Sequence, residues 1–207
     1  AYFFARKLNK ELNIPIGPVT DMGIFEHFFS QPELQILGEN VSIFYESNQY
    51  QLIPGELFSE NDLEKIFTIE HSVSENEMIL YKLLPKWGAS LAFRIPARIQ
   101  AFFEQKYPEA VIEHHISLLL KKQLANRETA CWLNIRKEMI DLIVIQNKQL
   151  QLLNSFQAKS NEDCCYYVLN VYEQLQLDTE TFHLKIMSEK SVNEQLFGLM
   201  KQYVRNV

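Results

Sequence analysis

The sequence predicts an α/β protein of two lobes, in which mixed sheets are flanked by helices. The main observation is at residues 131–156, where we expect three β-strands joined by two tight turns. A Ser-capped helix, a strand and a last helix follow, which gives the strand–strand–strand–helix–strand–helix order of a ribonuclease H-like fold. A second observation is that residues 49–67 resemble residues 148–168, since both contain a strand, a link and a Ser-capped helix. This likeness favours two similar lobes with a cleft between them.

The composition is that of an ordinary globular protein, with 207 residues, 47% hydrophobic and 22% charged. The net charge is −6 and the charges are mixed along the chain, so we expect no nucleic-acid partner and no polybasic membrane contact. No apolar run approaches the ~20 residues that span a bilayer, so we expect no membrane insertion. The chain begins inside apolar sequence, AYFFARKL, without Met, and we expect residues upstream of it.

The cysteines are Cys131, Cys164 and Cys165. An odd number with two adjacent members is a poor disulfide framework, so we expect reduced thiols in a cytoplasmic protein. The adjacent pair could be a redox or metal pair, but two small apolar residues on a helix are favoured. No CxxC and no His/Cys cluster is present, so we expect no metal site.

The first half should alternate short strands and helices. In order, we expect the end of a strand at residues 1–8, a helix from Thr20 or Asp21 to about Gln31, strands 41–46 and 49–53 paired as a hairpin, a short helix capped by Ser59, strands 77–84 and 89–95, a helix from Pro96, a strand near 110–114 and a helix near 116–125. Asn48 favours the hairpin, because Asn tolerates the left-handed turn conformation. Pro96 suits the first turn of a helix, and Pro32 and Pro108 would end helices.

The second half begins after NRET (126–129) and contains the three-stranded meander. We expect a helix from Ser160 to about Gln176, a strand at 181–187 and a last helix that begins at the capping pattern Ser191–Glu194. The apolar spacing of the two helices predicts their buried faces: Cys164, Val168, Val171, Tyr172 and Leu175 in the first, and Leu196, Leu199, Met200 and Tyr203 in the second.

Three stretches resemble an uncharacterised bacterial domain-of-unknown-function family: LLNSFQAKSNEDCCYYVLNVYEQLQLD (152–178), QLIPGELF (51–58) and FGLMKQYVRN (197–206). The match runs from about residue 40 to the end, and its N-S-F…E-D-x-x-Y-Y stretch is fairly specific. The resemblance implies an actin-like ATPase fold whose initial strands lie upstream of this chain. The repeated strand–helix pattern places the boundary between the lobes near 126–129, which gives a first lobe at 1–126 and a second lobe at 127–207. The resemblance implies no known reaction.

A nucleotide site of that fold needs strand–turn–strand loops with glycines and an acid. Glycine lets backbone amides approach phosphate, and the acid holds Mg²⁺ through water. The corresponding loop of the second lobe, Asn134–Met139, has neither Gly nor Asp, and no Gly occurs at 187–194, where the turn under the adenosine should fall. We therefore expect a degenerate nucleotide site and no cofactor, with ATP and Mg²⁺ as the alternative.

The candidate ligand-binding residues are Arg136 and Lys137, which could contact phosphate, and Asp141. Asp141 could face a cleft, but we expect it to face solvent or to pair with Arg136 or Lys137. We expect no catalytic residue. Structural roles are favoured at the remaining sites that could carry chemistry: a helix cap for the D-x-G at Asp21–Gly23, a packing or exposed role for His114–His115, a strand-ending turn for Asn154–Phe156, a helix-dipole role for Glu162–Asp163, and core packing or an aromatic patch for Phe156 with Tyr166–Tyr167.

These observations favour a non-catalytic interaction or scaffold protein with a protein partner. Two alternatives stay open. One is an ATP-binding enzyme, either an ATPase or a small-molecule kinase, which would use Arg136, Lys137 and an upstream loop. The other is a ligand sensor that uses the cleft between the lobes without hydrolysis.

Overall fold

The computed structural model describes residues 2–4, 11–13, 22–31, 42–188 and 194–207. Its elements fall into two units, unit 1 from Ala1 to Gln123 and unit 2 from Leu124 to Val207. Within the described residues, no helix combines the length and the apolar character that crossing a membrane requires.

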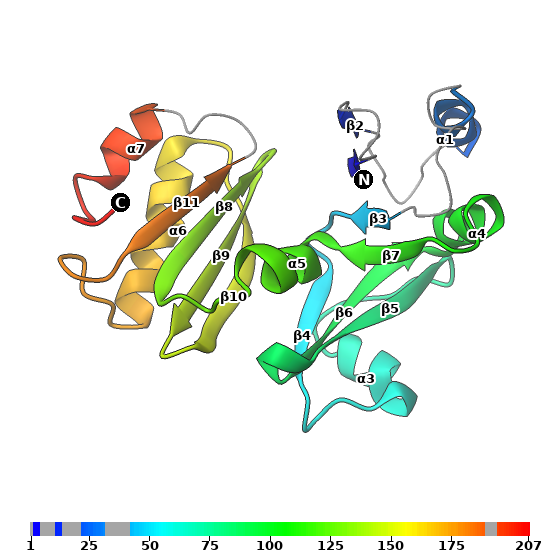
Figure 1. Ribbon diagram of the computed structural model, residues 1–207, viewed down its shortest axis with the longest axis horizontal. Coiled ribbons are helices and arrows are strands. Elements are labelled where there is room, and N and C mark those ends of the chain that lie inside the picture. The colour runs from blue at the N-terminus through cyan, green and yellow to red at the C-terminus, as the bar shows by residue number, and fades with distance from the viewer. Residues whose placement is uncertain (1, 5–10, 14–21, 32–41, 189–193) are drawn as a thin grey trace. The chain divides into compact units, whose positions relative to one another are not determined.

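Unit 2 has the element order that the sequence predicts (Figure 1). Its elements are β8 (Ala130–Arg136), β9 (Met139–Gln146), β10 (Gln149–Gln157), α6 (Asn161–Gln174), β11 (Leu184–Ser188) and α7 (Glu194–Met200). The sheet order is β10-β9-β8-β11, with β8, β9 and β10 antiparallel and β11 parallel to β8. The predicted ribonuclease H-like order of this half is therefore confirmed.

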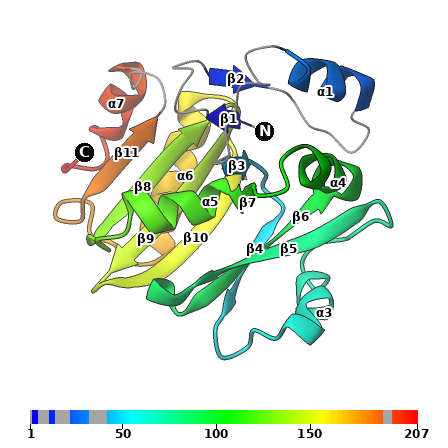
Figure 2. The same cartoon turned by 45° about the vertical axis from the view of Figure 1, so that its right-hand side comes forward.

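One face of this sheet packs against α6 and α7, and both views show α6 behind the strands (Figures 1 and 2). Helix α6 begins at a capping box, in which Ser160 Oγ accepts from the Asp163 amide at 3.1 Å and Asp163 Oδ2 accepts from the Ser160 amide at 3.1 Å. The predicted buried face of α6 is confirmed for Cys164, Val168, Val171 and Tyr172.

The buried face predicted for the last helix is wrong at Tyr203, which is 51% exposed. The reason is that α7 ends at Met200, so the helical spacing no longer places residue 203 on the inner face. The Tyr203 amide instead closes a turn onto the Met200 carbonyl at 3.0 Å. The predicted cap at Ser191 lies outside the described residues.

Unit 1 contains two sheets and four α-helices among its described residues. The first sheet has the order β2-β1-β3-β7 and the second β4-β6-β5. The strands are β1 (Tyr2–Phe4), β2 (Glu11–Asn13), β3 (Ser42–Tyr45), β4 (Tyr50–Pro54), β5 (Glu77–Leu84), β6 (Ala89–Pro96) and β7 (Val111–His114). The helices are α1 (Met22–Phe29), α3 (Leu63–Phe67), α4 (Ala97–Lys106) and α5 (His115–Leu118), which continues as a π-helical turn, Leu119–Gln123.

The hairpin predicted for residues 41–53 is wrong, because β3 pairs in parallel with β7 while β4 pairs with β6 in the other sheet. His114 contacts the link between β3 and β4. Its Nδ1 accepts from the Ile116 amide at 3.3 Å, so Nε2 carries the proton and donates to the Ser47 carbonyl at 3.1 Å. This bond fixes the link between the two sheets. Strand β4 pairs with a later strand, β6, whereas β10 (Gln149–Gln157) pairs with the preceding strand, β9. The likeness between residues 49–67 and 148–168 is therefore limited to the local order of strand, link and helix.

Apolar side chains attach the helices of unit 1 to their neighbours. Phe25 and Phe29 of α1 meet Phe102 and Phe103 of α4, with ring centroids 4.9–5.6 Å apart. Leu63 and Phe67 of α3 pack on the β4-β6-β5 sheet, which Figure 2 shows with α3 near one end. The predicted Ser59 cap of this helix is wrong, since Ser59 makes no side-chain cap bond and a 3-10 turn, Glu60–Asp62, precedes α3. The predicted Thr20 or Asp21 cap lies outside the described residues.

The predicted strands 77–84 and 89–95 are confirmed as the antiparallel pair β5 and β6. Their connection ends at Gly88, whose φ of +59° lies in the left-handed region. The Gly88 carbonyl accepts from the Gly55 amide at 2.7 Å, which ties this connection to the end of β4.

We predict opposite effects for two glycine-to-alanine changes. Gly88→Ala should lower the free energy of unfolding by about 1–2 kcal/mol, because an L side chain is strained at that φ although no atom lies within 4 Å of its Cβ. Gly198→Ala, at an exposed site inside α7 with equal space, should raise it by about 0.5–1 kcal/mol. Urea unfolding of both variants measures these changes, and equal signs would contradict the backbone account.

Candidate functional site

The strand register places Asp141 at the centre of the meander of unit 2. Asp141 lies on the middle strand, β9, directly opposite Asn134 of β8 and Ser155 of β10. Residues directly opposite each other in a sheet have side chains on the same face, and Arg136 joins them because it lies two residues after Asn134. We call Asn134, Arg136, Asp141 and Ser155 the Asp141 network.

Both oxygens of the Asp141 carboxylate accept hydrogen bonds from this network. Oδ2 accepts from Asn134 Nδ2 at 2.8 Å and from Arg136 Nε at 2.9 Å. Oδ1 accepts from Arg136 Nη2 at 2.7 Å and from Ser155 Oγ at 2.5 Å. A carboxylate has about four acceptor positions, so these bonds fill its capacity to accept hydrogen bonds.

The Arg136–Asp141 pair is buried, with 9% of the Arg136 side chain and 0% of the Asp141 side chain exposed. Burying a lone carboxylate is costly, and a two-point contact from the planar guanidinium offsets that cost better than a single contact would. The pair therefore neutralises charge within the sheet, and either partner alone would be an unpaired buried ion.

The turn between β8 and β9 consists of Lys137 and Glu138, closed by the pair Arg136 and Met139. Glu138 has a φ of +54°, a conformation that glycine adopts without strain. Both turn side chains are exposed. The Glu138 carbonyl accepts from the Ala158 amide at 3.0 Å, which ties the turn to the end of β10.

The structure brings two of the three candidate residues together. Arg136 and Asp141 pair, as one of the sequence alternatives has it, whereas the alternative in which Asp141 faces solvent is wrong. Lys137 is exposed in the adjoining turn. Sequence reasoning missed Asn134 and Ser155 as partners of Asp141. The available signal was the meander itself, because antiparallel pairing across two short turns aligns 134, 141 and 155.

The strand-ending turn predicted at Asn154–Phe156 is wrong, because all three residues lie inside β10. From this position on β10, the Ser155 hydroxyl donates a hydrogen bond to Asp141. The ring of Phe156 stacks on Tyr167 of α6 with centroids 4.5 Å apart, and both pack against the core of unit 2. Tyr166 is 63% exposed beside them, so the aromatic group is part core and part surface.

Among the remaining candidates, His114 and the cysteines are buried and have packing or hydrogen-bonding roles. His114 is fully buried and holds Ser47. The three cysteines are free and buried, and burial raises the pKa of the Cys131 thiol to about 12 and that of Cys164 to about 11. Within the described part of the chain, no group of three or more His, Cys, Asp or Glu side chains could hold a metal ion.

Comparison with known proteins gives a family and a fold. The sequence profile of a family described as "Protein of unknown function (DUF3822)" matches residues 23–207. The chain is similar to a protein of Bacteroides thetaiotaomicron VPI-5482, whose crystal structure at 1.85 Å resolution is described as having an actin-like ATPase fold and unknown function. The TM-score is 0.81 at 25% sequence identity, covering 97% of this chain and 82% of that chain. No protein of curated function matches. The predicted family resemblance and fold class are thereby confirmed.

We predict that replacing one residue of the buried Arg136–Asp141 pair destabilises the protein more than replacing both residues with apolar ones. Asp141→Ala should lower the free energy of unfolding by about 3–5 kcal/mol, because Arg136 is left as an uncompensated buried charge. The double variant Arg136→Met with Asp141→Leu should be clearly more stable than Asp141→Ala. Urea unfolding measures both.

The matched control is Glu180→Ala in the same unit, where the ion pair with Arg205 is 65% and 74% exposed. Its removal should change the free energy of unfolding by less than about 1 kcal/mol. An Asp141→Ala loss no larger than that of Glu180→Ala would contradict a structural role for the network.

The raised pKa of the buried thiols predicts that the stability of the protein depends on pH. Burial raises the pKa of Cys131 to about 12, so its stabilising contribution is complete below the pKa of the unfolded thiol and is lost as pH rises toward 12. The free energy of unfolding should therefore fall above about pH 9, by up to about 1.4 kcal/mol per pH unit for each such thiol. Urea unfolding between pH 8 and 11 measures the slope, and Cys131→Ala should make it shallower. An unchanged slope would contradict the assignment.

Proposed function

Since the chain belongs to the DUF3822 family of proteins of unknown function and has an actin-like ATPase fold, we propose that it is a non-catalytic interaction or scaffold protein. In this proposal the nucleotide site of the fold is degenerate, and the protein acts by binding a partner protein.

The observation that carries the proposal is the Asp141 network beside the β8–β9 turn. This turn is where the fold would place a phosphate loop in unit 2. A phosphate loop needs several backbone N–H groups that converge on the anion, which glycines make accessible. Here a two-residue turn, Lys137–Glu138, carries side chains at both positions.

The two buried charged groups beside the turn, Arg136 and Asp141, already have partners. Binding Mg²⁺ to Asp141 would require its carboxylate to give up bonds from Arg136, Asn134 or Ser155. Binding phosphate to Arg136 would leave Asp141 buried without its counter-ion. This arrangement favours a structural network over a nucleotide site and leaves Lys137, which is exposed, as the remaining candidate cation.

Apolar side chains at the surface support the interaction role. Leu57 is 67% exposed, Ile69 79% and Tyr166 63%. Exposed apolar side chains are ordinary one at a time, so each of these is only a candidate point of contact with a partner. The three free thiols fit a reducing compartment, and we place the protein in the cytoplasm.

Thermal unfolding with and without Mg-ATP tests the proposal. We predict no change in Tm at millimolar Mg-ATP. A ligand that binds the folded state at a concentration one hundred times its Kd would add about 2.7 kcal/mol, so even a modest site would shift Tm by several degrees.

Two controls make the result decisive. ATP without Mg²⁺ separates a metal-dependent site from weak anion binding. Lys137→Ala removes the exposed candidate cation without disturbing the Asp141 network. A Tm rise that needs Mg²⁺ would overturn the proposal in favour of an ATP-binding enzyme, and its loss in Lys137→Ala would locate the site.

A further inference from the structure

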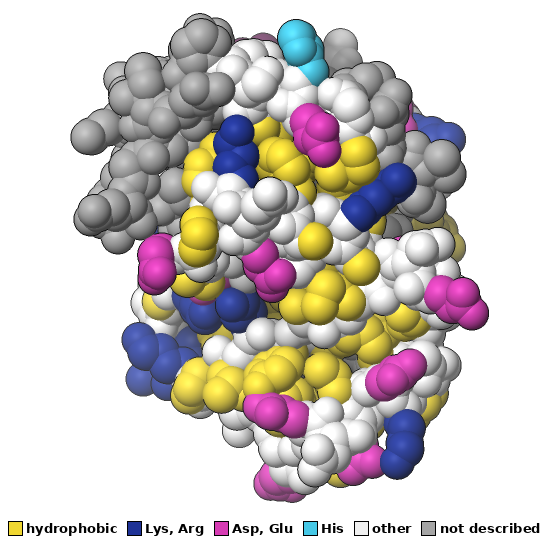
Figure 3. Space-filling model, turned by 90° about the vertical axis from the view of Figure 1, so that its right-hand side faces the viewer, with side chains coloured by type: hydrophobic (Ala, Val, Ile, Leu, Met, Phe, Trp, Pro, Cys, Tyr) yellow, Lys and Arg dark blue, Asp and Glu magenta, His cyan; other side chains and the backbone are white. Residues whose placement is uncertain are grey.

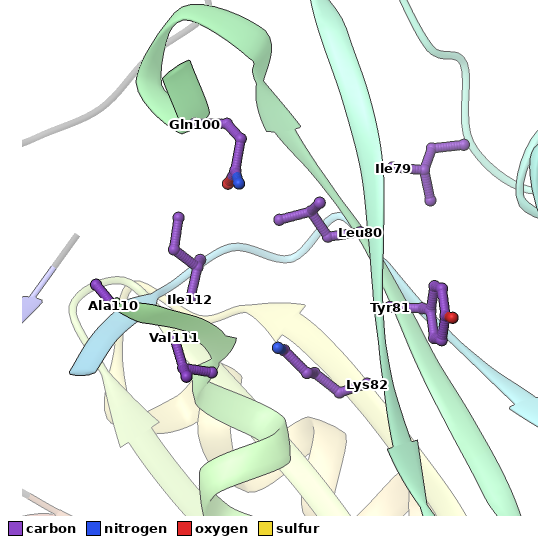
Figure 4. A pocket seen from close by; sticks show the side chains of 8 residues that line it. All are labelled: Ile79, Leu80, Tyr81, Lys82, Gln100, Ala110, Val111 and Ile112. Carbon is purple, nitrogen blue, oxygen red and sulfur yellow. The ribbon is translucent and has the colours of Figure 1, made fainter. Parts of the chain in front are cut away.

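A pocket of about 360 Å³ lies in unit 1 between strands β5 and β7. It is lined by Ile79–Lys82 of β5, by Gln100 of α4 and by Ala110–Ile112 at β7. In Figure 4, Leu80 and Lys82 point from β5 toward β7, whereas Ile79 and Tyr81 lie on the other side of β5. We call it the β5–β7 pocket. No part of it belongs to the Asp141 network, so it is a separate feature of the protein.

Both strands that flank the pocket are edge strands among the described strands. β5 ends the order β4-β6-β5, and β7 ends the order β2-β1-β3-β7. The outer backbone N–H and C=O groups of an edge strand are a template for pairing with another strand, and proteins often block such edges with charge or proline. Strand β5, EMILYKLL, has neither proline nor glycine and carries charge at Glu77 and Lys82.

Apolar side chains on these strands reach solvent. Met78 and Leu83 of β5 are 36% and 55% exposed, and Val111 of β7 is 49% exposed. Figure 3 shows the face that lies to the right in Figure 1, where hydrophobic side chains gather in patches among charged ones. Exposed apolar groups beside a free strand edge are typical of a surface that a partner covers.

A buried acceptor at the pocket has no donor. Gln100 Oε1 is buried without a hydrogen-bond partner, while Gln100 Nε2 donates to Glu104 Oε1 at 2.8 Å. The bond to Glu104 fixes the orientation of the amide, because only the NH₂ group can donate to that carboxylate. In Figure 4 the end of the Gln100 side chain points into the space between β5 and β7. A ligand that offers an N–H group would satisfy this oxygen.

A lysine at the pocket is also without an ion-pair partner. Its neighbour Glu113 is held by Lys121 Nζ at 3.0 Å and by Ser117 Oγ at 2.9 Å, and the structure gives Lys82 no ion pair among the described residues. Burial is the main cause that lowers the pKa of Lys82; Glu113 opposes it and Lys121 adds to it. Two lysines and one glutamate leave this end of the pocket positive, which suits an anionic group.

We propose that the β5–β7 pocket binds an extended peptide segment of a partner protein, which adds as a strand to the free edge of β5 and places an acidic side chain beside Lys82. Backbone N–H groups would bond the strand edge and Gln100, and apolar side chains would cover Met78, Leu83 and Val111. Strand addition of this kind takes affinity from main-chain bonds and specificity from side-chain pockets. The inference rests on the proposed interaction function and names its site and the chemistry of the partner.

Defined peptide pools test the proposal with the full chain. The first is a fluorescein-labelled heptapeptide pool with Val, Ile or Leu at alternate positions and a central Glu. The second replaces the Glu with Gln, and the third keeps the Glu but carries N-methyl groups on alternate backbone amides. Fluorescence anisotropy measures binding, and each protein variant is first shown to keep its Tm.

We expect the Glu pool to bind about tenfold more tightly than the Gln pool, and the N-methyl pool not to bind. Lys82→Met, which keeps the apolar stem, should weaken the Glu pool about tenfold and leave the Gln pool unchanged. Gln100→Leu should weaken both pools. Lys65→Met is the matched control, because Lys65 is an exposed lysine on α3 paired with Asp62, and it should change neither.

No binding by the Glu pool, binding that survives both Lys82→Met and Gln100→Leu, or equal binding of the N-methyl pool would overturn the proposal. Full competition by N-acetylglutamate amide would also overturn it, in favour of a small-anion site. The outcome is independent of the Mg-ATP test. Peptide binding together with an Mg-ATP shift would reject only the proposed non-nucleotide role, and the absence of both would reject only the peptide site.

Discussion

The buried carboxylate of Asp141 is the constraint on which the arrangement of unit 2 depends. A charge in the middle strand of a sheet must be paired, and three strands contribute to doing so: Asn134 and Arg136 from β8 and Ser155 from β10. The network thereby fixes the register of β8, β9 and β10, because a shift of one residue would move Asp141 to the opposite, apolar face. A short turn between β8 and β9 follows from that register.

The same constraint bears on function. An actin-like fold binds nucleotide by leaving backbone amides and a carboxylate available near this turn, whereas here the carboxylate has partners and the turn carries Lys137 and Glu138. In the proposed scaffold role, the fold keeps its sheet and helices and this loop binds no nucleotide. Two polar groups without a hydrogen-bond or ion-pair partner among the described residues, Gln100 Oε1 and the Lys82 ammonium, lie in unit 1 at the β5–β7 pocket. In the proposed role, a partner is therefore recognised at the edge of β5 and not at the phosphate-loop position.

Local signals in the sequence were enough to predict α6, where the Ser160 capping box, a regular apolar spacing and the following strand agree. They were insufficient where the partner is distant in sequence. The link at Ser47 could form a hairpin, but its strands pair instead with β7 and β6, and His114, 67 residues away, bonds the link itself. At the site, the sequence predicts Arg136 as one alternative partner of Asp141, and the structure has this pair. Ser155 does not follow from the sequence, because the pattern at Asn154–Phe156 predicts a turn that ends the strand, whereas these residues lie inside β10.

Hydrogen–deuterium exchange of the full chain, with and without Mg-ATP, tests the central claim most directly, because it reports on the backbone amides of the β8–β9 turn itself. The account predicts slow exchange in strands β8 and β9, since these strands and the buried network open only with unit 2, fast exchange at the exposed turn residues Lys137 and Glu138, and no change in residues 134–141 when Mg-ATP is added. New protection of Lys137–Met139 that requires Mg²⁺ would contradict it and restore this turn as a phosphate loop.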